Sequence, residues 1–201
     1  SNSTVSGNTA TANGGGIQNA DQSTLTLVNS TVTANTSSTG SGGGINNTGL
    51  ARLGNSIVAS NTGSTNNELS GAFSTLGNNL IRDLGSATGL ANQVSSDLVG
   101  SAASPVEPLL SALQDNGGPT LSHALLAGSP AIDAGNSSGA AASDQTRRTR
   151  SLDGNADGAA AVDIGAVEYR DGTRTFTVNV TTDSTDASLG DGTAADSSGQ
   201  I

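Results

Sequence analysis

The residues best suited to chemistry lie close together in the stretch DGNADGAAAVDIG, residues 153–165. Asp153, Asn155 and Asp157 occupy alternate positions, Gly158 follows them directly, and Asp163 lies further along the same stretch. Calcium is a hard cation that takes several oxygen ligands, and a tight turn with a glycine brings alternate side chains to one point. The pattern predicts a Ca²⁺ site with Asp153, Asn155, Asp157 and Asp163 as ligands.

The spacing departs from that of a helix-flanked calcium loop. Such a loop ends on a bidentate Glu at its twelfth position, whereas this chain has Ile164 there. The flanking residues also lack the apolar spacing of helices. We therefore expect a calcium loop between strands rather than an EF-hand. The alternative interpretation is a polar turn that joins two strands.

Other constellations that could support catalysis are sparse, and we expect no enzyme. Polysaccharide cleavage needs paired carboxylates, or calcium with a basic residue, on one face. Residues 1–67 contain only Asp21 and Arg52 as charged side chains. The single histidine, His123, is interpreted as a structural hydrogen-bonding residue. The arginines of TRRTR, residues 146–150, are expected to pair with neighbouring aspartates rather than to bind an anion.

The elements that position these residues must be built from small side chains. The chain has 201 residues, with 1% aromatic residues and no Cys, Met or Trp, so its core must consist of Val, Ile, Leu and Ala. Its net charge of −10 argues against binding to nucleic acid or to an anionic membrane. The absence of cysteine excludes disulfides and thiolate metal sites. No apolar run is long enough to span a bilayer, and we expect no signal peptide within this stretch.

A repeat explains how so polar a chain can form a core. NSTV at residues 2–5 returns as NSTV at 29–32 and as NSIV at 55–58, and GGGI at 14–17 returns at 42–45. A period in the twenties with short alternating segments is typical of a β-solenoid. We therefore predict an all-β fold, a right-handed parallel β-helix whose coils stack about 4.8 Å apart. A flexible low-complexity linker is the alternative interpretation.

Stacking of the repeats predicts columns of like residues. Each strand would pair in parallel with its equivalent one coil away, so that identical side chains lie above one another. The aliphatic residues would form internal ladders, and the asparagines would form an amide ladder that also bonds the turn backbone. The predicted ladders are Val5, Val32 and Val58; Ile17 and Ile45; and Asn8, Asn35 and Asn61.

These NSTVSGN and GGGI units resemble the coils of right-handed parallel β-helices, including the repeats of polymorphic outer-membrane proteins. Downstream, LGNNLIRD, LQDNGGPTLSHALLAGSPAIDAG, SDQ and VDIGAVEY are similar to the choice-of-anchor Q domain. The resemblance covers roughly residues 55–169. It implies a secreted or surface-anchored bacterial protein with an architectural role rather than a chemistry.

The C-terminal stretch from Thr175 to Ile201 resembles a CSLREA-like module start, although Ala194 stands where a Cys would be expected. Its alternating run contains Phe176, Val178 and Val180 and is the strongest isolated strand in the sequence. We expect this strand to add to the open first coil of the next subunit or module. A head-to-tail contact of this kind, if it does not close, produces a filament.

The predicted organisation has four parts: parallel β-helix coils over 1–84, a loop over 85–118, a choice-of-anchor-Q-like cap over 119–170, and a strand and tail over 171–201. Apolar residues of the cap, among them Ile132 and Ile164, are expected to cover the C-terminal end of the solenoid. The predicted function is that of an extracellular structural module of a bacterial fibre, sheath or adhesin that forms a homo-oligomer or polymer. The alternatives are a glycan-binding or ice-binding adhesin and, less favoured, a β-helical polysaccharide lyase or hydrolase.

Overall fold

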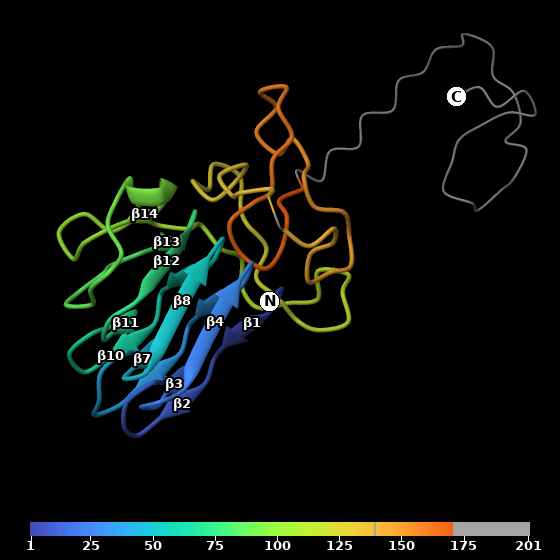
Figure 1. Ribbon diagram of the computed structural model, residues 1–201. Coiled ribbons are helices and arrows are strands. Elements are labelled where there is room, and N and C mark those ends of the chain that lie inside the picture. Colours follow the sequence, from blue (N-terminus) through green and yellow to red (C-terminus); the bar gives the residue numbers. More distant parts are fainter. Residues whose placement is uncertain (139, 171–201) are drawn as a thin grey trace, which may run out of the picture. The chain divides into compact units, whose positions relative to one another are not determined.

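The computed structural model describes residues 1–138 and 140–170, of which Ser1–Tyr169 form one compact unit (Figure 1). The first part of this unit is a parallel β-solenoid of about three turns. The structure therefore confirms the parallel β-helix predicted from the repeats. The predicted strand with Phe176, Val178 and Val180 lies outside the described residues.

Each of the first three coils contributes one short strand to each of four sheets, β13 and β14 extend the first sheet, and every pairing between named strands is parallel. The strand order follows the coils, so that strands of successive coils are hydrogen-bonded neighbours. The first sheet contains β1 (Thr4–Ser6), β5 (Thr31–Thr33), β9 (Ile57–Ala59), β13 (Leu80–Ile81) and β14 (Leu98–Val99). The second contains β2 (Thr9–Ala10), β6 (Thr36–Ser37) and β10 (Thr62–Gly63). The third contains β3 (Ile17–Asn19), β7 (Ile45–Asn47) and β11 (Leu69–Ser70). The fourth contains β4 (Thr24–Val28), β8 (Leu50–Gly54) and β12 (Ser74–Gly77).

The aliphatic columns run along the inside of the coils. Val5 pairs with Val32, and Val32 pairs with Val58, as the repeat spacing predicts. The column continues through Ile81 and Val99, two rungs that the repeat does not mark. A second column stacks Ile17, Ile45 and Leu69. With Leu27, Leu53 and Phe73 these residues form the core inside the coils.

The stacked coils extend beyond residue 84. Strand β14 and the short 3-10 helix η1 (Val94–Ser96) both fall in the segment 85–118 that the sequence predicts as a loop. Leu98 and Val99 pair with Leu80 and Ile81, so the chain adds a fifth rung to the first sheet. The sequence does not reveal this rung because its spacing from the fourth differs from the repeat period.

Glycine is required where coils approach most closely. A Cβ on Gly43 would collide with the backbone of Thr62, which belongs to the next coil. The neighbouring Gly42 has a φ of +66°, a conformation that side chains disfavour. The triple-glycine corner therefore allows the coil to turn within the spacing of one strand.

The segment after the coils packs along their side. Residues 110–169 have only isolated β-bridges among the described residues, and they lie beside the first sheet (Figure 1). Ile57, Ala59 and Leu80 on the outer face of that sheet pack against Leu125, Ala131 and Ile164, in a second apolar cluster.

This placement corrects the prediction that Ile132, Ile164 and their neighbours cover the C-terminal end of the solenoid. Ile164 contacts the third coil, Ala166 donates a hydrogen bond to Thr31 Oγ1 in the second, and Gln145 accepts one from Thr4 Oγ1 in the first. The segment therefore spans the coils lengthwise. The outer face of the first sheet carries Ile57 and Leu80, and the segment buries these apolar side chains, which is favourable because it removes apolar surface from water.

Candidate functional site

The interface between the coils and this flanking segment, residues 110–169, brings together polar side chains that lie far apart in the sequence. It holds a buried ion pair, a serine–histidine contact and two hollows. The ladders inside the coils and the turn with Asp153, Asn155 and Asp157 are the sites expected from the sequence, and the ladders lie outside this interface.

The predicted asparagine ladder is a continuous chain of amide hydrogen bonds. Asn8 Nδ2 donates to Asn35 Oδ1 at 2.9 Å, and Asn35 Nδ2 donates to Asn61 Oδ1 at 2.9 Å. Asn35 Oδ1 also accepts the backbone N–H of Asn8, and Asn61 Oδ1 accepts that of Asn35. The ladder thereby satisfies the turn backbone that the coil corner buries.

A carboxylate, not another amide, ends this ladder. Glu68 Oε2 accepts from Asn61 Nδ2 at 2.8 Å and from Asn61 N at 3.1 Å, and the side chain is buried. Burial raises the pKa of Glu68, and the hydrogen bonds from Asn61 oppose that rise. The sequence hint was the position of Glu68 directly before the third-coil strand β11, where the preceding coils have Gly16 and Gly44.

A second polar ladder ends in the same way. Asn79 Oδ1 accepts from Ser56 N, and Asp97 Oδ1 in turn accepts from Asn79 N at 2.8 Å and Nδ2 at 2.9 Å. Asp97 is fully buried. An acceptor with no hydrogen to donate suits the end of such a ladder, because the last amide still presents N–H groups.

The four residues predicted to bind calcium do not share one site. Asp153, Asn155 and Asp157 lie in one exposed turn, where their oxygens accept backbone N–H groups of Asp157, Gly158 and Ala159. Asp163 is buried elsewhere and accepts hydrogen bonds from the backbone of Asp133 and Tyr169. Within residues 1–138 and 140–170, no group of three or more His, Cys, Asp or Glu side chains is placed to hold a metal ion.

A buried ion pair within the flanking segment includes an arginine that also hydrogen-bonds to the first coil. Arg150 Nη1 lies 2.6 Å from Glu168 Oε1, and the two side chains are 1% and 0% exposed. Arg150 Nη2 also donates to Asn2 Oδ1 at 2.9 Å and to the carbonyls of Gly165 and Ala166 at 3.1 Å. The sequence predicts that this arginine pairs with neighbouring aspartates, whereas its ionic partner is Glu168.

Two carboxyl groups beside this ion pair have raised pKa values. Burial raises the pKa of Asp163 to about 6. Burial, and after it the negative charge of Asp163, raises the pKa of Glu168 to about 7 against the opposing effect of Arg150. The backbone N–H of Asp163 donates to Glu168 Oε1 at 3.1 Å, which places the two residues next to each other.

A serine and the histidine meet at the edge of the same interface. Ser6 Oγ lies 2.8 Å from His123 Nε2, and His123 Nδ1 lies 2.7 Å from the carbonyl oxygen of Ser111. On the same strand, Thr4 Oγ1 donates to Gln145 Oε1 at 2.6 Å. From the sequence alone His123 is interpreted as structural and nothing marks Ser6, because the two residues are 117 positions apart.

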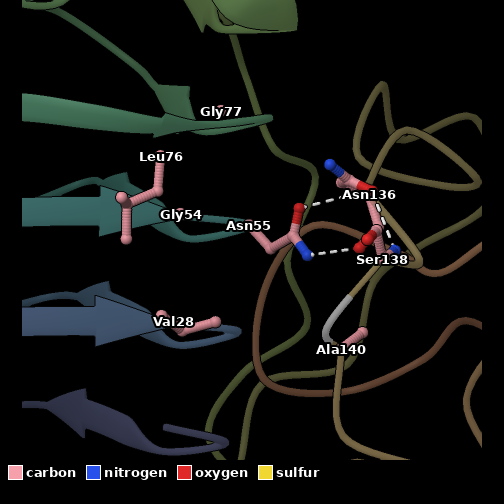
Figure 2. A pocket seen from close by; sticks show the side chains of 8 residues that line it. All are labelled: Val28, Gly54, Asn55, Leu76, Gly77, Asn136, Ser138 and Ala140. Carbon is pink, nitrogen blue, oxygen red and sulfur yellow. Dashed lines mark hydrogen bonds between the residues drawn. The ribbon is translucent and has the colours of Figure 1, made fainter.

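Two hollows open along the interface. One, of about 370 Å³, lies beside the first coil and is lined by residues that include Asn2, Thr4, Thr120, Leu121 and Gln145. The other, of about 160 Å³, lies where the flanking segment meets the fourth sheet. Its lining is shown in Figure 2: Val28, Gly54, Asn55, Leu76, Gly77, Asn136, Ser138 and Ala140.

The smaller hollow is closed on one side by a pair of reciprocal hydrogen bonds. Asn55 Nδ2 donates to the carbonyl of Asn136 at 2.9 Å, and Asn136 N donates to Asn55 Oδ1 at 2.8 Å (Figure 2). Asn55 has a φ of +47°, a left-handed conformation that asparagine tolerates at the corner of a coil. The hollow is thus a consequence of how the coil corner docks the flanking segment.

A comparison of this chain with known protein families, characterised proteins and solved structures finds no match. The resemblance to the choice-of-anchor Q domain therefore remains an expectation from sequence. In the part of the chain that the structure describes, no helix is long and apolar enough to cross a membrane.

Proposed function

We propose that the protein is a structural module of a bacterial surface fibre, sheath or adhesin. The observation that carries this proposal is the unbroken column of five strands in register, from β1 to β14. Its hydrogen bonds run between coils, along the direction in which the coils stack. A force along that direction is shared among the sheets and the amide ladders, which suits a module that connects one end of a surface protein to the other.

The flanking segment supports the same role. It contacts the first, second and third coils through Gln145, Ala166 and Ile164. The flanking segment therefore holds successive coils together, so that separating one coil from the next also requires breaking apolar contacts with this segment. Arg150, which is paired with Glu168, holds the flanking segment to the first coil through its hydrogen bond to Asn2.

Assembly is proposed to use the alternating run at residues 175–180. In an extended strand, Phe176, Val178 and Val180 share one face and Thr177 lies on the other. Strand addition to a neighbouring subunit would bury the apolar face. The proposed localisation at the bacterial cell surface rests on the sequence resemblance alone.

Sedimentation velocity and negative-stain electron microscopy of the full chain test the proposal. We expect elongated head-to-tail particles whose size grows with protein concentration, and a single monomeric species after deletion of residues 173–201. Val178→Asp should abolish assembly because it places a charge on the apolar face, whereas Thr177→Asp should preserve it. A full chain that stays monomeric at every concentration would contradict the assembly.

A second candidate function, binding of a repetitive glycan, is favoured by one observation. Thr9, Thr36 and Thr62 stand in register on the second sheet, and Thr9 and Thr62 are exposed. Such a row presents hydroxyl groups about 4.8 Å apart, one per coil. Binding on a glycan array that Thr36→Val abolishes would establish this function, and silence on the array together with no effect on ice growth would remove it.

A further inference from the structure

The contact between Ser6 and His123 has the geometry of a nucleophile beside its base. Ser6 is the last residue of β1, half-buried, and its Oγ lies 2.8 Å from His123 Nε2. His123 is 8% exposed. Separations of about 2.6–3.2 Å between nucleophile and base, with the base oriented by a third group, are the signature of an activated hydroxyl.

The third group settles which nitrogen of the imidazole carries the proton. Nδ1 lies 2.7 Å from the carbonyl oxygen of Ser111. A carbonyl oxygen can only accept a hydrogen bond, so Nδ1 must be the donor. In the neutral ring Nε2 is then the acceptor, and the Ser6 hydroxyl donates to it. A backbone carbonyl thereby fixes the tautomer that can remove a proton from Ser6.

The histidine is held in place by two segments that are joined by isolated antiparallel bridges. The backbone of Ser111 donates to Ala124 O at 2.8 Å, and Ala124 N donates back to Ser111 Oγ at 3.0 Å. Bridges on both sides, between Leu110 and Leu125 and between Gln114 and Ser122, keep the two segments antiparallel. The orienting carbonyl and the imidazole are therefore parts of one small, hydrogen-bonded unit.

The residues two positions before Ser6 and two positions before His123 both line one hollow. Thr4 precedes Ser6 by two residues and shares its face of β1, which puts their Cα atoms about 6.6 Å apart. Leu121 precedes His123 by two residues, and both Thr4 and Leu121 line the hollow of about 370 Å³. A small acyl group that reaches Ser6 would have this space beside it.

We propose that Ser6 is a covalent acylation site that takes one acyl group from an activated ester with His123 as its base. Ser6 Oγ attacks the ester carbonyl, and a new C–O bond forms as the bond to the leaving alcohol breaks. The hydroxyl proton passes to His123 Nε2 and then to the leaving alkoxide, which departs as the alcohol. The product is an ester on Ser6, and the imidazole returns to its neutral form. This inference goes beyond the structural role proposed above and does not depend on it.

The test uses the full chain and p-nitrophenyl acetate, with release of p-nitrophenol followed by absorbance and the acetylated residue located by tandem mass spectrometry. The chain contains no lysine, so side-chain amines do not compete. We expect one acetyl group per chain, on Ser6. Ser6→Ala should lose it, while Ser74→Ala, which removes an exposed serine of β12, should leave it unchanged.

His123→Asn isolates the base. The asparagine amide can still donate to Ser111 O from the position of Nδ1, but it has no counterpart of Nε2. We expect acetylation of Ser6 to slow about 100-fold or more, the usual contribution of a general base, while the thermal melting curve shows that the variant remains folded. Three results would overturn the proposal: acetyl groups scattered over many serines and threonines, acetyl found on His123 alone, or equal rates in the wild type and His123→Asn. If His123→Asn does not fold, the comparison of Ser6→Ala with Ser74→Ala still decides whether Ser6 is the site.

Discussion

Asn61 Nδ2 donates a 2.8 Å hydrogen bond to Oε2 of the buried Glu68, and this bond ends the amide ladder that begins at Asn8. The same carboxylate oxygen accepts the backbone N–H of Asn61. One side chain therefore satisfies two donors that the last corner of the ladder would otherwise bury unpaired.

Removal of this carboxylate should be costly. Glu68→Ala leaves two buried donors of Asn61 without an acceptor and creates a void, so we expect the free energy of unfolding to fall by about 3 kcal/mol. Glu68→Gln keeps one acceptor oxygen and should lose less than half of that. Denaturant unfolding measures both, with Glu107→Ala as a control because Glu107 is exposed and its ion pair with Arg82 lies at the surface. Equal, small effects for all three variants would contradict the assignment.

Close docking of the flanking segment can be tested with two glycines that both have positive φ. Gly165 has a φ of +111°, and a Cβ there would meet the side chains of Ile57 and Thr31. Gly158 has a φ of +91° with nothing within 4 Å of such a Cβ. Both changes to alanine strain the backbone by about 1 kcal/mol, but Gly165→Ala should also separate the segment from the coils.

We therefore expect a thermal melting temperature several degrees lower for Gly165→Ala than for Gly158→Ala. Limited proteolysis should also cut residues 140–169 faster in Gly165→Ala. Identical melting temperatures for the two variants would show that the segment does not pack closely on the second and third coils.

The raised pKa values of Asp163 and Glu168 predict how stability depends on pH. The folded-state values, about 6 and about 7, lie above the ordinary values of 3.8 and 4.5. The folded chain therefore holds protons that the unfolded chain has released, and the resulting stability is present at low pH and lost as pH rises through 6 and 7. The free energy of unfolding should decrease from pH 5 to pH 8.

Asp163→Asn should flatten this decrease, because it removes one titrating group and its charge from beside Glu168. Asp21→Asn is the matched control, since Asp21 is exposed on the first coil, and it should leave the slope unchanged. A stability that rises from pH 5 to pH 8 in the unmodified chain would reverse the predicted sign.

Calcium binding remains a prediction from sequence, now restricted to the turn with Asp153, Asn155 and Asp157. Three side chains with exposed surroundings predict weak binding, with a dissociation constant on the order of 10⁻⁴–10⁻³ M. Isothermal titration calorimetry should record a heat that Asp157→Ala abolishes and Asp163→Asn preserves. An absence of heat at millimolar calcium would end this prediction.

The aliphatic and amide ladders were predictable because the repeat itself states which residues stack. Val5, Val32 and Val58 occupy equivalent positions in successive copies of the repeat. Because equivalent strands pair in parallel and in register, residues at equivalent positions contact one another. The rungs at Ile81 and Val99 were not predictable, because fewer residues separate successive rungs there than in the repeat, while the register in space is preserved.

The contacts between the coils and the flanking segment could not be predicted from the sequence, for a different reason. Ser6 and His123, or Asn2 and Arg150, meet only because a non-repetitive segment lies along the coils. Such contacts depend on tertiary packing, and no local pattern records them. For the turn containing Asp157, the sequence predicted a contact that the fold does not make. The residue spacing suggested that Asp163 joins this turn, whereas Asp163 is buried next to Glu168.

The stacking of like residues in register is the claim on which the rest depends, and engineered disulfides test it directly. The chain has no cysteine, so a pair introduced by substitution reacts without background. Thr36 and Thr62 are register partners on adjacent coils, about 4.8 Å apart and within the range for a disulfide. Thr9 and Thr62 are two coils apart, at about 9.6 Å, beyond that range. Under mild oxidation Thr36→Cys/Thr62→Cys should form an intramolecular disulfide nearly completely, and Thr9→Cys/Thr62→Cys should keep both thiols free. Equal oxidation of the two pairs, or a disulfide only in the second, would contradict the stacked coil.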